Sequence, residues 1–365
     1  MDGVPPFHVI ALHGLVRDKF GKKMSRSKGN AIDPLELMDI YGADAIRFTL
    51  ARGANPGADQ ALAEEWIAGS RNFGTKLWNA TRFAIMNGAT VDGEIPAFET
   101  LNAIDRWILS RLNETVKEVD QLFETYEFAR ACDVIYHFAW DELCDWYLEL
   151  SKEAFASGTA HDSKRVLGFV LDQLMRLMHP IMPFITEELW TALTNGESLV
   201  VAEWPKPIAS HHDIDGEKLI LEVQEIITEV RRFRNDQGIK SSQRLPGQFH
   251  APKEFARYES AMRFVLRIDH PEEGFFAPSK TLEIGSFKIE LDLSQAIDIV
   301  AERARLSKDL IAAKKDRETA SVKLSNEGFM SKAPESIVIE IKQRLAKTDS
   351  DIERITAELA KLPTA

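Results

Sequence analysis

The chain has 365 residues, of which 44% are hydrophobic and 28% charged, and its formal net charge is −12. This composition predicts a globular protein of two or three domains and argues against nucleic-acid binding by the whole surface, so any nucleic acid must be bound by local basic patches. No apolar run is long enough to span a bilayer and no signal peptide is recognisable, so we expect a cytoplasmic protein.

Residues 1–58 begin with a short apolar run, Phe7–Leu12, which predicts a buried strand. A loop follows, Gly21-Lys22-Lys23-Met24-Ser25-Arg26-Ser27-Lys28-Gly29-Asn30, with four cations and no acid. It runs into Asp33 and Pro34, which suit the N-cap and first turn of a helix. A cationic loop before a helix N-terminus suits an anion such as phosphate; a solvated basic loop is the alternative.

Residues 34–53 predict two short helices, which Gly42 separates and of which Asp44 can cap the second. From there to about residue 205, apolar residues recur at spacings of three and four, which predicts a helical bundle over residues 59–205. Its four stripes are Trp66, Ser70, Phe73, Leu77, Ala80 and Ala84; Ile104, Ile108, Leu112, Val116, Val119 and Phe123; Phe128, Cys132, Ile135, Ala139, Leu143 and Tyr147; and Val166, Val170, Leu174, Leu177 and Met178. A short helix is expected from about Phe184 to Leu193. Cys132 and Cys144 lack metal-site spacing, so we expect reduced core thiols.

Residues 206–295 predict a small α/β module. A helix is expected from about 216 to 235, and strands include 281–284 and 287–293, the latter with alternating hydrophobicity. His211 and His212 lie in a polar linker before the helix. We interpret them as a solvated loop rather than a metal site, because no further ligand follows at metal-site spacing.

Residues 296–365 predict two amphipathic helices that form an antiparallel coiled-coil hairpin. Arg303 and Arg317 fall in core-facing slots of the first helix. Helix stop and start signals stand at Ser325–Gly328 and Lys332–Glu335. Helices of about 25 residues give an arm of roughly 35–40 Å, which is either a reaching device or an oligomerisation element.

Several of these segments resemble one family of enzymes. Lys23-Met24-Ser25-Arg26-Ser27 resembles the KMSKS loop of class I aminoacyl-tRNA synthetases. Arg71–Phe83 and His179–Trp190 are similar to parts of the anticodon-binding bundle in the valine, isoleucine and leucine enzymes. Lys323–Pro334 is similar to the C-terminal coiled-coil arm of valyl-tRNA synthetases. The resemblance spans essentially the whole chain and implies the ATP-dependent attachment of valine to its tRNA.

The resemblance also assigns roles in the loop. It implies that Lys23, Met24, Ser25, Arg26 and Ser27 bind ATP, a substrate that normally comes with Mg²⁺, and that Lys23 and Arg26 are catalytic. Positioned cations stabilise the pyrophosphate that leaves when a carboxylate attacks the α-phosphate. Arg26 departs from the family's usual lysine; it keeps the charge but offers a planar fork in place of a point charge.

The family's HIGH motif, valine pocket and editing domain are not recognisable in the sequence, which therefore resembles the C-terminal portion of these enzymes. We expect that the isolated chain does not form aminoacyl-adenylate, and that valine binds only together with the missing N-terminal portion.

Residues expected to contact tRNA lie in three places. In the bundle, Arg82 and Phe83 suit stacking on an unpaired base, with a core role for Phe83 as the alternative. In the module, the densest basic patch contains Arg231, Arg232 and Arg234; it suits phosphate contacts or is a solvated helix face. In the arm, the resemblance implies contacts with tRNA by Arg305, Lys314, Lys315 and Arg344. The alternative is an exposed coiled coil that binds no partner, because such a helix pair also interleaves basic and acidic residues.

The sequence thus predicts a mainly α protein. Residues 1–58 are the end of a class I nucleotide-binding domain, 59–205 the anticodon-binding bundle, 206–295 the α/β module and 296–365 the tRNA-binding arm. Rival hypotheses are a non-catalytic tRNA-binding module and a scaffold that self-associates through its coiled coil. We expect a monomer, because the hairpin satisfies its own seam, and we expect no metal site.

Overall fold

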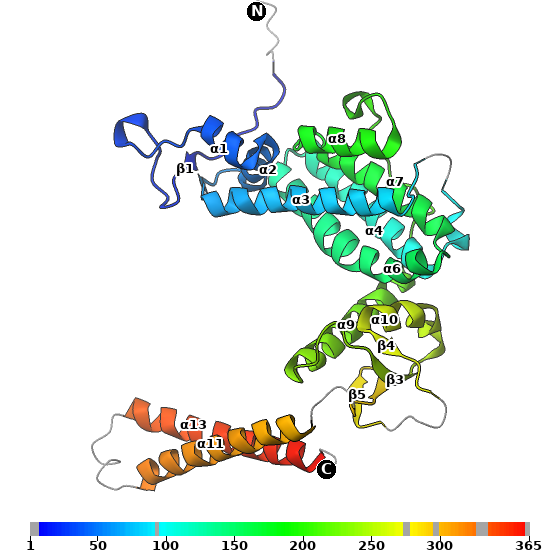
Figure 1. Cartoon of the computed structure of the whole chain (residues 1–365). Helices are drawn as coiled ribbons and strands as arrows, with labels where there is room; N and C mark the ends of the chain where they lie inside the picture. The colour runs from blue at the N-terminus through cyan, green and yellow to red at the C-terminus, as the bar shows by residue number, and fades with distance from the viewer. Residues whose placement is uncertain (1–6, 92–94, 273–277, 295–298, 326–334, 362–365) are drawn as a thin grey trace, which may run out of the picture. The chain divides into compact units, whose positions relative to one another are not determined.

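The computed structural model describes residues 7–91, 95–272, 278–294, 299–325 and 335–361 (Figure 1). Its described residues form two compact units, one made of the chain up to 229 with 251–266, the other of 230–250 with the chain from 267 onward. The chain is mainly helical, which confirms the predicted fold class. No helix in the described ranges is long and apolar enough to cross a membrane.

The predicted strand at the start of the first unit is wrong. Residues 7–12 adopt no regular structure, and Phe7, Ile10 and Leu12 are all more than 70% exposed. A strand needs a neighbour for its backbone hydrogen bonds, and in the part of the chain that the structure describes this run has none. Pairing begins only at β1 (Val16–Arg17), which lies parallel to β2 (Gln60–Ala61).

The two short helices are confirmed as α1 (Pro34–Tyr41) and α2 (Ala43–Gly53), joined at Gly42 with φ 85°. Asp33 is the predicted N-cap, because its carboxylate accepts a hydrogen bond from Leu35 N at 2.9 Å. Asp44 does not cap its own helix. Its carboxylate instead accepts hydrogen bonds from the N–H groups of Phe184, at 3.3 Å, and Ile185, at 2.6 Å. These two residues lie in the first turn of another helix, whose own N-cap residue provides no side-chain hydrogen bond.

The bundle contains the predicted helices in order. They are α3 (Glu64–Met86), α4 (Ala103–Glu124), α5 (Phe128–His137), η3 (Phe138–Tyr147), α6 (Leu148–Ser157), α7 (His161–Met178) and α8 (Pro183–Thr194). Most stripe residues are buried as expected, but Trp66 and Phe128 are exposed. The third predicted helix is α-helical only in its first half, α5, and its second half, η3, is π-helical. Apolar residues there recur every four positions, which is a longer spacing than the 3.6 residues of one α-helical turn. A π-helical turn contains more residues and therefore keeps residues at this spacing on one face.

A buried carboxyl ties three of these helices together. Asp105 of α4 is fully buried and accepts hydrogen bonds from Tyr147 Oη at 2.7 Å and Ser163 Oγ at 2.6 Å. Asn102 Nδ2 donates a third at 2.5 Å, while its Oδ1 caps α4. Burial raises the pKa of Asp105 above its ordinary value, and the three donors only partly oppose that shift.

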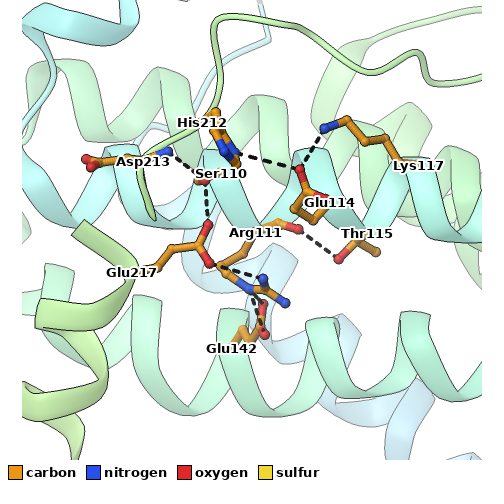
Figure 2. A network of polar contacts seen from close by, with 9 residues as sticks. All are labelled: Ser110, Arg111, Glu114, Thr115, Lys117, Glu142, His212, Asp213 and Glu217. Carbon is orange, nitrogen blue, oxygen red and sulfur yellow. Dashed lines mark hydrogen bonds and ion pairs between the residues drawn. The ribbon is translucent and has the colours of Figure 1, made fainter. Parts of the chain in front are cut away.

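The start of α9 (Ile214–Asp236) is fixed to the bundle by a polar network (Figure 2). Figure 2 shows Arg111 of α4 between two carboxylates, and its Nε lies 3.1 Å from Glu142 while its Nη1 lies 3.2 Å from Glu217. Ser110 Oγ donates to Glu217 at 2.6 Å and accepts from Asp213 N at 3.0 Å. These contacts fix the first turn of α9 to α4 within the first unit.

The histidine pair before α9 is not the solvated loop that we expected. His211 is buried and its ring stacks on Phe98 with centroids 5.2 Å apart. Burial lowers the pKa of His211, so the neutral ring is favoured at that position. His212 remains half-exposed, with Nδ1 3.8 Å from a carboxylate oxygen of Glu114. The polar sequence around the pair concealed an aromatic contact with a residue more than a hundred positions earlier.

The second unit contains a mixed sheet of order β4-β3-β6-β5. Its strands are β3 (Leu245–His250), β4 (Ile268–Asp269), β5 (Lys280–Ile284) and β6 (Phe287–Leu291). β5 and β6 confirm the two predicted strands; β3 pairs antiparallel with β6 and parallel with β4. Between β3 and β4, η5 (Lys253–Tyr258) and α10 (Glu259–Leu266) fall in the first unit, where α10 packs against α6.

The arm is the predicted antiparallel pair, α11 (Ile299–Ser325) and α13 (Glu335–Lys361). Leu306, Ala320 and Ile355 are buried between the helices. Arg317 does not fill a core-facing slot: its side chain is mostly exposed and its Nε lies 2.6 Å from Asp349 of the other helix. The predicted stop and start signals fall largely on 326–334, outside the described residues, as does the side chain of Arg303.

Candidate functional site

The cationic loop is closed at its base by two residues with complementary side chains. Asp18 Oδ1 accepts the N–H groups of Phe20 at 3.0 Å and Lys22 at 2.8 Å, and its Oδ2 accepts from Asn30 Nδ2 at 2.9 Å. Asn30 Oδ1 in turn accepts the N–H of Ser25 at 3.0 Å. One Asp–Asn pair therefore joins both ends of the loop and holds its middle.

The loop residues singled out from the sequence lie between the two ends that this clamp joins. Lys23 and Ser27 are exposed, and Met24 and Ser25 are half-buried. Arg26 opens the short turn η1 (Arg26–Lys28); its side chain is outside the described part of the structure. Gly21 and Gly29, with φ of 75° and 66°, provide the left-handed conformations at the loop's two bends.

The adjoining helix N-terminus is partly occupied by its own cap. The carboxylate of Asp33 occupies the Leu35 N–H at the start of α1. An anion held by the loop would therefore be met by the cations and hydroxyls of the loop, with Ser25 Oγ and Ser27 Oγ 3.3 Å apart. The sequence located this loop, Asn30 included, but missed the contact between Asp18 and Asn30 that closes it. The available signals were an Asp just after a strand and an Asn just before a helix cap.

Asp18→Ala is expected to open the loop and to speed tryptic cleavage after Lys22, Lys23 or Arg26, because the loop amides lose their acceptor. Glu36→Ala, an exposed acid on α1, is the matched control and should leave the cleavage rate unchanged. Equal cleavage of both variants and the native chain would show that Asp18 does not close the loop.

We also expect the closure of the loop by Asp18 and Asn30 to depend on pH. The Asn30 amide, then the Lys22 N–H, lower the pKa of Asp18 below its ordinary value of 3.8. An acid with a lowered folded pKa stabilises the closed loop above that ordinary value, and the contribution is lost as the pH falls through the folded pKa. We therefore expect the Asn30 side-chain amide resonance to be constant from neutral pH to about 4 and to shift only below it.

In the bundle, Arg82 and Phe83 lie near the end of α3. Arg82 is exposed, whereas Phe83 is half-buried and makes an edge-on contact with Phe155 of α6, with ring centroids 5.6 Å apart. Both interpretations of Phe83 thus have a physical basis, since one edge of the ring packs inward while part of its surface stays accessible.

The three arginines of α9 do not share one environment. Arg231 and Arg232 are exposed on the helix. Arg234 is buried, and its guanidinium donates to the carbonyls of Lys240 at 3.1 Å and Gln243 at 2.5 Å. Burial, then the charge of Arg267, lower the pKa of Arg234. Arg234 therefore stabilises the turn after α9. Of the three arginines predicted to contact phosphate, Arg231 and Arg232 are the two on the surface.

On the arm, Lys314 and Lys315 are exposed on α11. Arg344 of α13 is exposed and forms a two-pronged ion pair with Asp316, whose hydrogen bond raises the pKa of Arg344. The side chain of Arg305 lies outside the described residues. A polyanion bound at this arm would meet two lysines directly and would compete with Asp316 for Arg344.

The described residues contain no group of three or more His, Cys, Asp or Glu side chains placed to hold a metal ion. Cys132 and Cys144 are free and buried, as expected. Burial raises the pKa of each thiol to about 12, so both are neutral and inert at physiological pH.

Three family profiles match the chain. They are described as tRNA synthetases class I (I, L, M and V), over residues 1–63; anticodon-binding domain of tRNA ligase, over 105–248; and valyl tRNA synthetase tRNA binding arm, over 298–363. Their order along the chain follows the order of the loop, the bundle with α9, and the arm.

Curated relatives resemble the chain over its entire length. It is 57% identical to the valine–tRNA ligase of Streptomyces avermitilis and 56% identical to that of Streptomyces coelicolor, over 100% of this chain and 42% of each relative. The chain thus spans less than half the length of the curated relatives it matches. Among solved structures, the LeuRS–tRNA–LeuAMS complex of Agrobacterium radiobacter K84 aligns with 66% of this chain and 31% of its own, at 24% identity and a TM-score of 0.47.

Proposed function

We propose that the chain, which matches the C-terminal portion of valine–tRNA ligases, supplies the ATP-contacting loop and the tRNA-binding surfaces of such an enzyme. The observation that carries the proposal is the clamped loop, which presents Lys23 and Ser27 to solvent ahead of a helical bundle and an arm in the family's order. The matches to these relatives and family profiles bear out the resemblance found in the loop, bundle and arm motifs.

In the proposed reaction, the carboxylate of valine attacks the α-phosphate of ATP and pyrophosphate leaves. Negative charge grows on the leaving group, and Lys23 and Arg26 are placed in the loop to stabilise it. Ser25 and Ser27 donate hydrogen bonds to phosphate oxygens, and the half-buried Met24 anchors the loop. ATP is a substrate here; the Mg²⁺ that normally accompanies it would be brought with the nucleotide.

The tRNA is proposed to contact Arg82 and Phe83 in the bundle, Arg231 and Arg232 on α9, and the cations of the arm. Arg82, Arg231 and Arg232 are exposed and Phe83 is half-buried, which suits contacts with phosphate and unpaired bases. We further propose a cytoplasmic monomer, because the helices of the arm already pair with each other.

Isolated, the chain should bind a valine tRNA transcript in a filter-binding assay, with an affinity that falls linearly with salt on a double logarithmic plot. It should catalyse no valine-dependent ATP–pyrophosphate exchange, because the surfaces that would bind adenosine and valine are not among those recognised in its sequence. Exchange activity of the isolated chain would contradict this part of the proposal, and an absence of tRNA binding would contradict the whole of it.

A non-catalytic tRNA-binding module is the second candidate, because the chain matches only 42% of its relatives' length and that part includes the tRNA-binding family profiles. The two functions differ in what Lys23 does. In the synthetase it acts on pyrophosphate; in a binding module its removal would change nothing beyond tRNA affinity.

A further inference from the structure

The exposed surface of α3 has an unusual charge pattern for a protein of net charge −12. From Trp66 to Met86 the helix contains three cations, Arg71, Lys76 and Arg82, and no acidic residue. Exposed helices usually alternate charges of both signs, which solvates them without favouring a partner of either sign. A long helix segment with cations alone favours a polyanion.

Two of these cations share one face of α3 with an exposed aromatic ring. Arg71, Thr75, Trp78 and Arg82 follow one another at spacings of four, three and four, and all four are exposed. Trp78 is 47% exposed, which is a large apolar surface to leave in water. Lys76 points elsewhere: it pairs with Asp145 at 2.5 Å and lies 3.8 Å from the centre of the Trp140 ring.

Beside this face lies a pocket of about 500 Å³ in the first unit, between α3, the junction of α1 and α2, and α8. Trp78 and Phe184 both line it, and Phe184 is 66% exposed. Its volume is that of a small-ligand site. The lining is mainly apolar and includes Met182 and Ile185; it also includes Asp44, whose carboxylate is taken up by the N–H groups at the start of α8.

The cation at this pocket is held in place by its neighbours. The guanidinium of Arg71 lies 5.6 Å from the centre of the Tyr41 ring, and Tyr41 Oη donates to Glu64 at 2.7 Å. Arg71 thus stands at the pocket wall next to an aromatic ring that is itself oriented. Two exposed aromatics and a positioned arginine are the groups that bind a base and its phosphate in single-stranded RNA.

We infer that this pocket receives an unpaired nucleotide of the bound tRNA, with its base against Trp78 and Phe184 and its phosphate near Arg71, and that the RNA backbone continues along α3 to Arg82. This inference rests on the proposed function, because it takes tRNA as the ligand. It extends that function by a contact separate from Phe83, on a face of α3 that faces α8 rather than α6.

The test is filter binding of a valine tRNA transcript to the full chain and its variants. Trp78→Ala and Phe184→Ala should each weaken binding by about 5- to 150-fold, the range that loss of one base-stacking contact gives. Arg71→Gln should weaken binding and reduce the slope of the salt dependence by about one, the signature of one lost phosphate contact.

Matched controls come from other faces of the same helix. Trp66 is 53% exposed but lines a different pocket, and Lys76 is paired with Asp145, so Trp66→Ala and Lys76→Gln should bind within about twofold of the native chain. Thermal unfolding of each variant, followed by helical circular dichroism, verifies that α3 remains folded.

If the native chain binds tRNA and Trp78→Ala binds equally well, the inference is overturned while the proposed function stands. The inference is also overturned if Trp66→Ala weakens binding as much as Trp78→Ala, since the helix and not the pocket would then matter. If the native chain binds no tRNA, the proposed function itself fails.

Discussion

Lys23→Ala is expected to lower valine-dependent ATP–pyrophosphate exchange by about 10²–10³-fold in a chimera that joins the N-terminal part of the Streptomyces avermitilis valine–tRNA ligase to this chain. The chimera is reasonable because the two sequences are 57% identical over the whole of this chain. The Lys23 side chain is exposed, and its contact with the clamp is made by its backbone carbonyl, which accepts from Asn30 Nδ2 at 3.3 Å, so the substitution takes away a cation without loosening the loop. The loss should appear in the rate of exchange more than in the affinity for valine.

Lys22→Ala is the matched control for that experiment. Lys22 is the preceding residue and is also exposed, and its contact with Asp18 uses the backbone N–H, which the substitution keeps. We expect exchange within about threefold of the unsubstituted chimera. A full rate in the Lys23→Ala chimera, or an equal loss with Lys22→Ala, would mean that Lys23 has no specific role with pyrophosphate.

Asp105→Ala is expected to lower the free energy of unfolding of the bundle by about 3–5 kcal/mol, since it leaves several buried donors without an acceptor. Tyr147 Oη and Ser163 Oγ both donate to this carboxylate from other helices. The loss would fall on the packing of α4 against η3 and α7. Urea unfolding followed by helical circular dichroism measures it.

Asp105→Asn separates the hydrogen bonds from the charge. The amide keeps one acceptor oxygen, and the two hydroxyls can each accept as well as donate, so we expect a loss of no more than about 1 kcal/mol at neutral pH. Because burial raises the folded pKa of Asp105, its stabilising contribution is greatest below the unfolded pKa and declines as the pH rises through the folded pKa. The Asn variant should lack that decline. Equal stabilities of the Ala and Asn variants would contradict the assigned role.

The helices were predictable because each one has an apolar stripe and recognisable ends. Asp33 caps α1 as its position predicts, and the stripe of α7, with Val166, Val170 and Leu174, is fully buried. The hairpin of β5 and β6 follows from alternation in the same way. In all these cases the information lies within a few residues along the chain, which is the range that periodicity and capping cover.

Long-range contacts were not predictable from the same patterns. Asp44 accepts N–H groups from residues 140 and 141 positions later in the chain. His211 is buried against Phe98, and Arg234 turns inward to carbonyl groups, although each sits in a polar stretch of sequence. Residues 7–12 show the opposite failure, since an apolar run forms a strand only where a partner strand is present.

The sequence predicted which residues of the candidate site carry its charges and hydroxyl groups, but not the contacts that hold them in place. The loop with Lys23 and Arg26 was found from its composition and its resemblance to a known motif. The clamp that closes it joins Asp18 to Asn30, which are 12 residues apart, and neither belongs to the motif. The pocket beside Trp78 depends on α8 lying against α3, which a single sequence does not specify.

We propose that this chain carries the tRNA-reading part of a valine–tRNA ligase. It is tested most directly by filter binding of the chain to a valine tRNA transcript and to the same transcript with its three anticodon bases replaced. The account predicts that the valine transcript binds at least about fivefold more tightly, since loss of even one stacked base costs that much. Equal affinity for the two transcripts, or no binding of either, would contradict it.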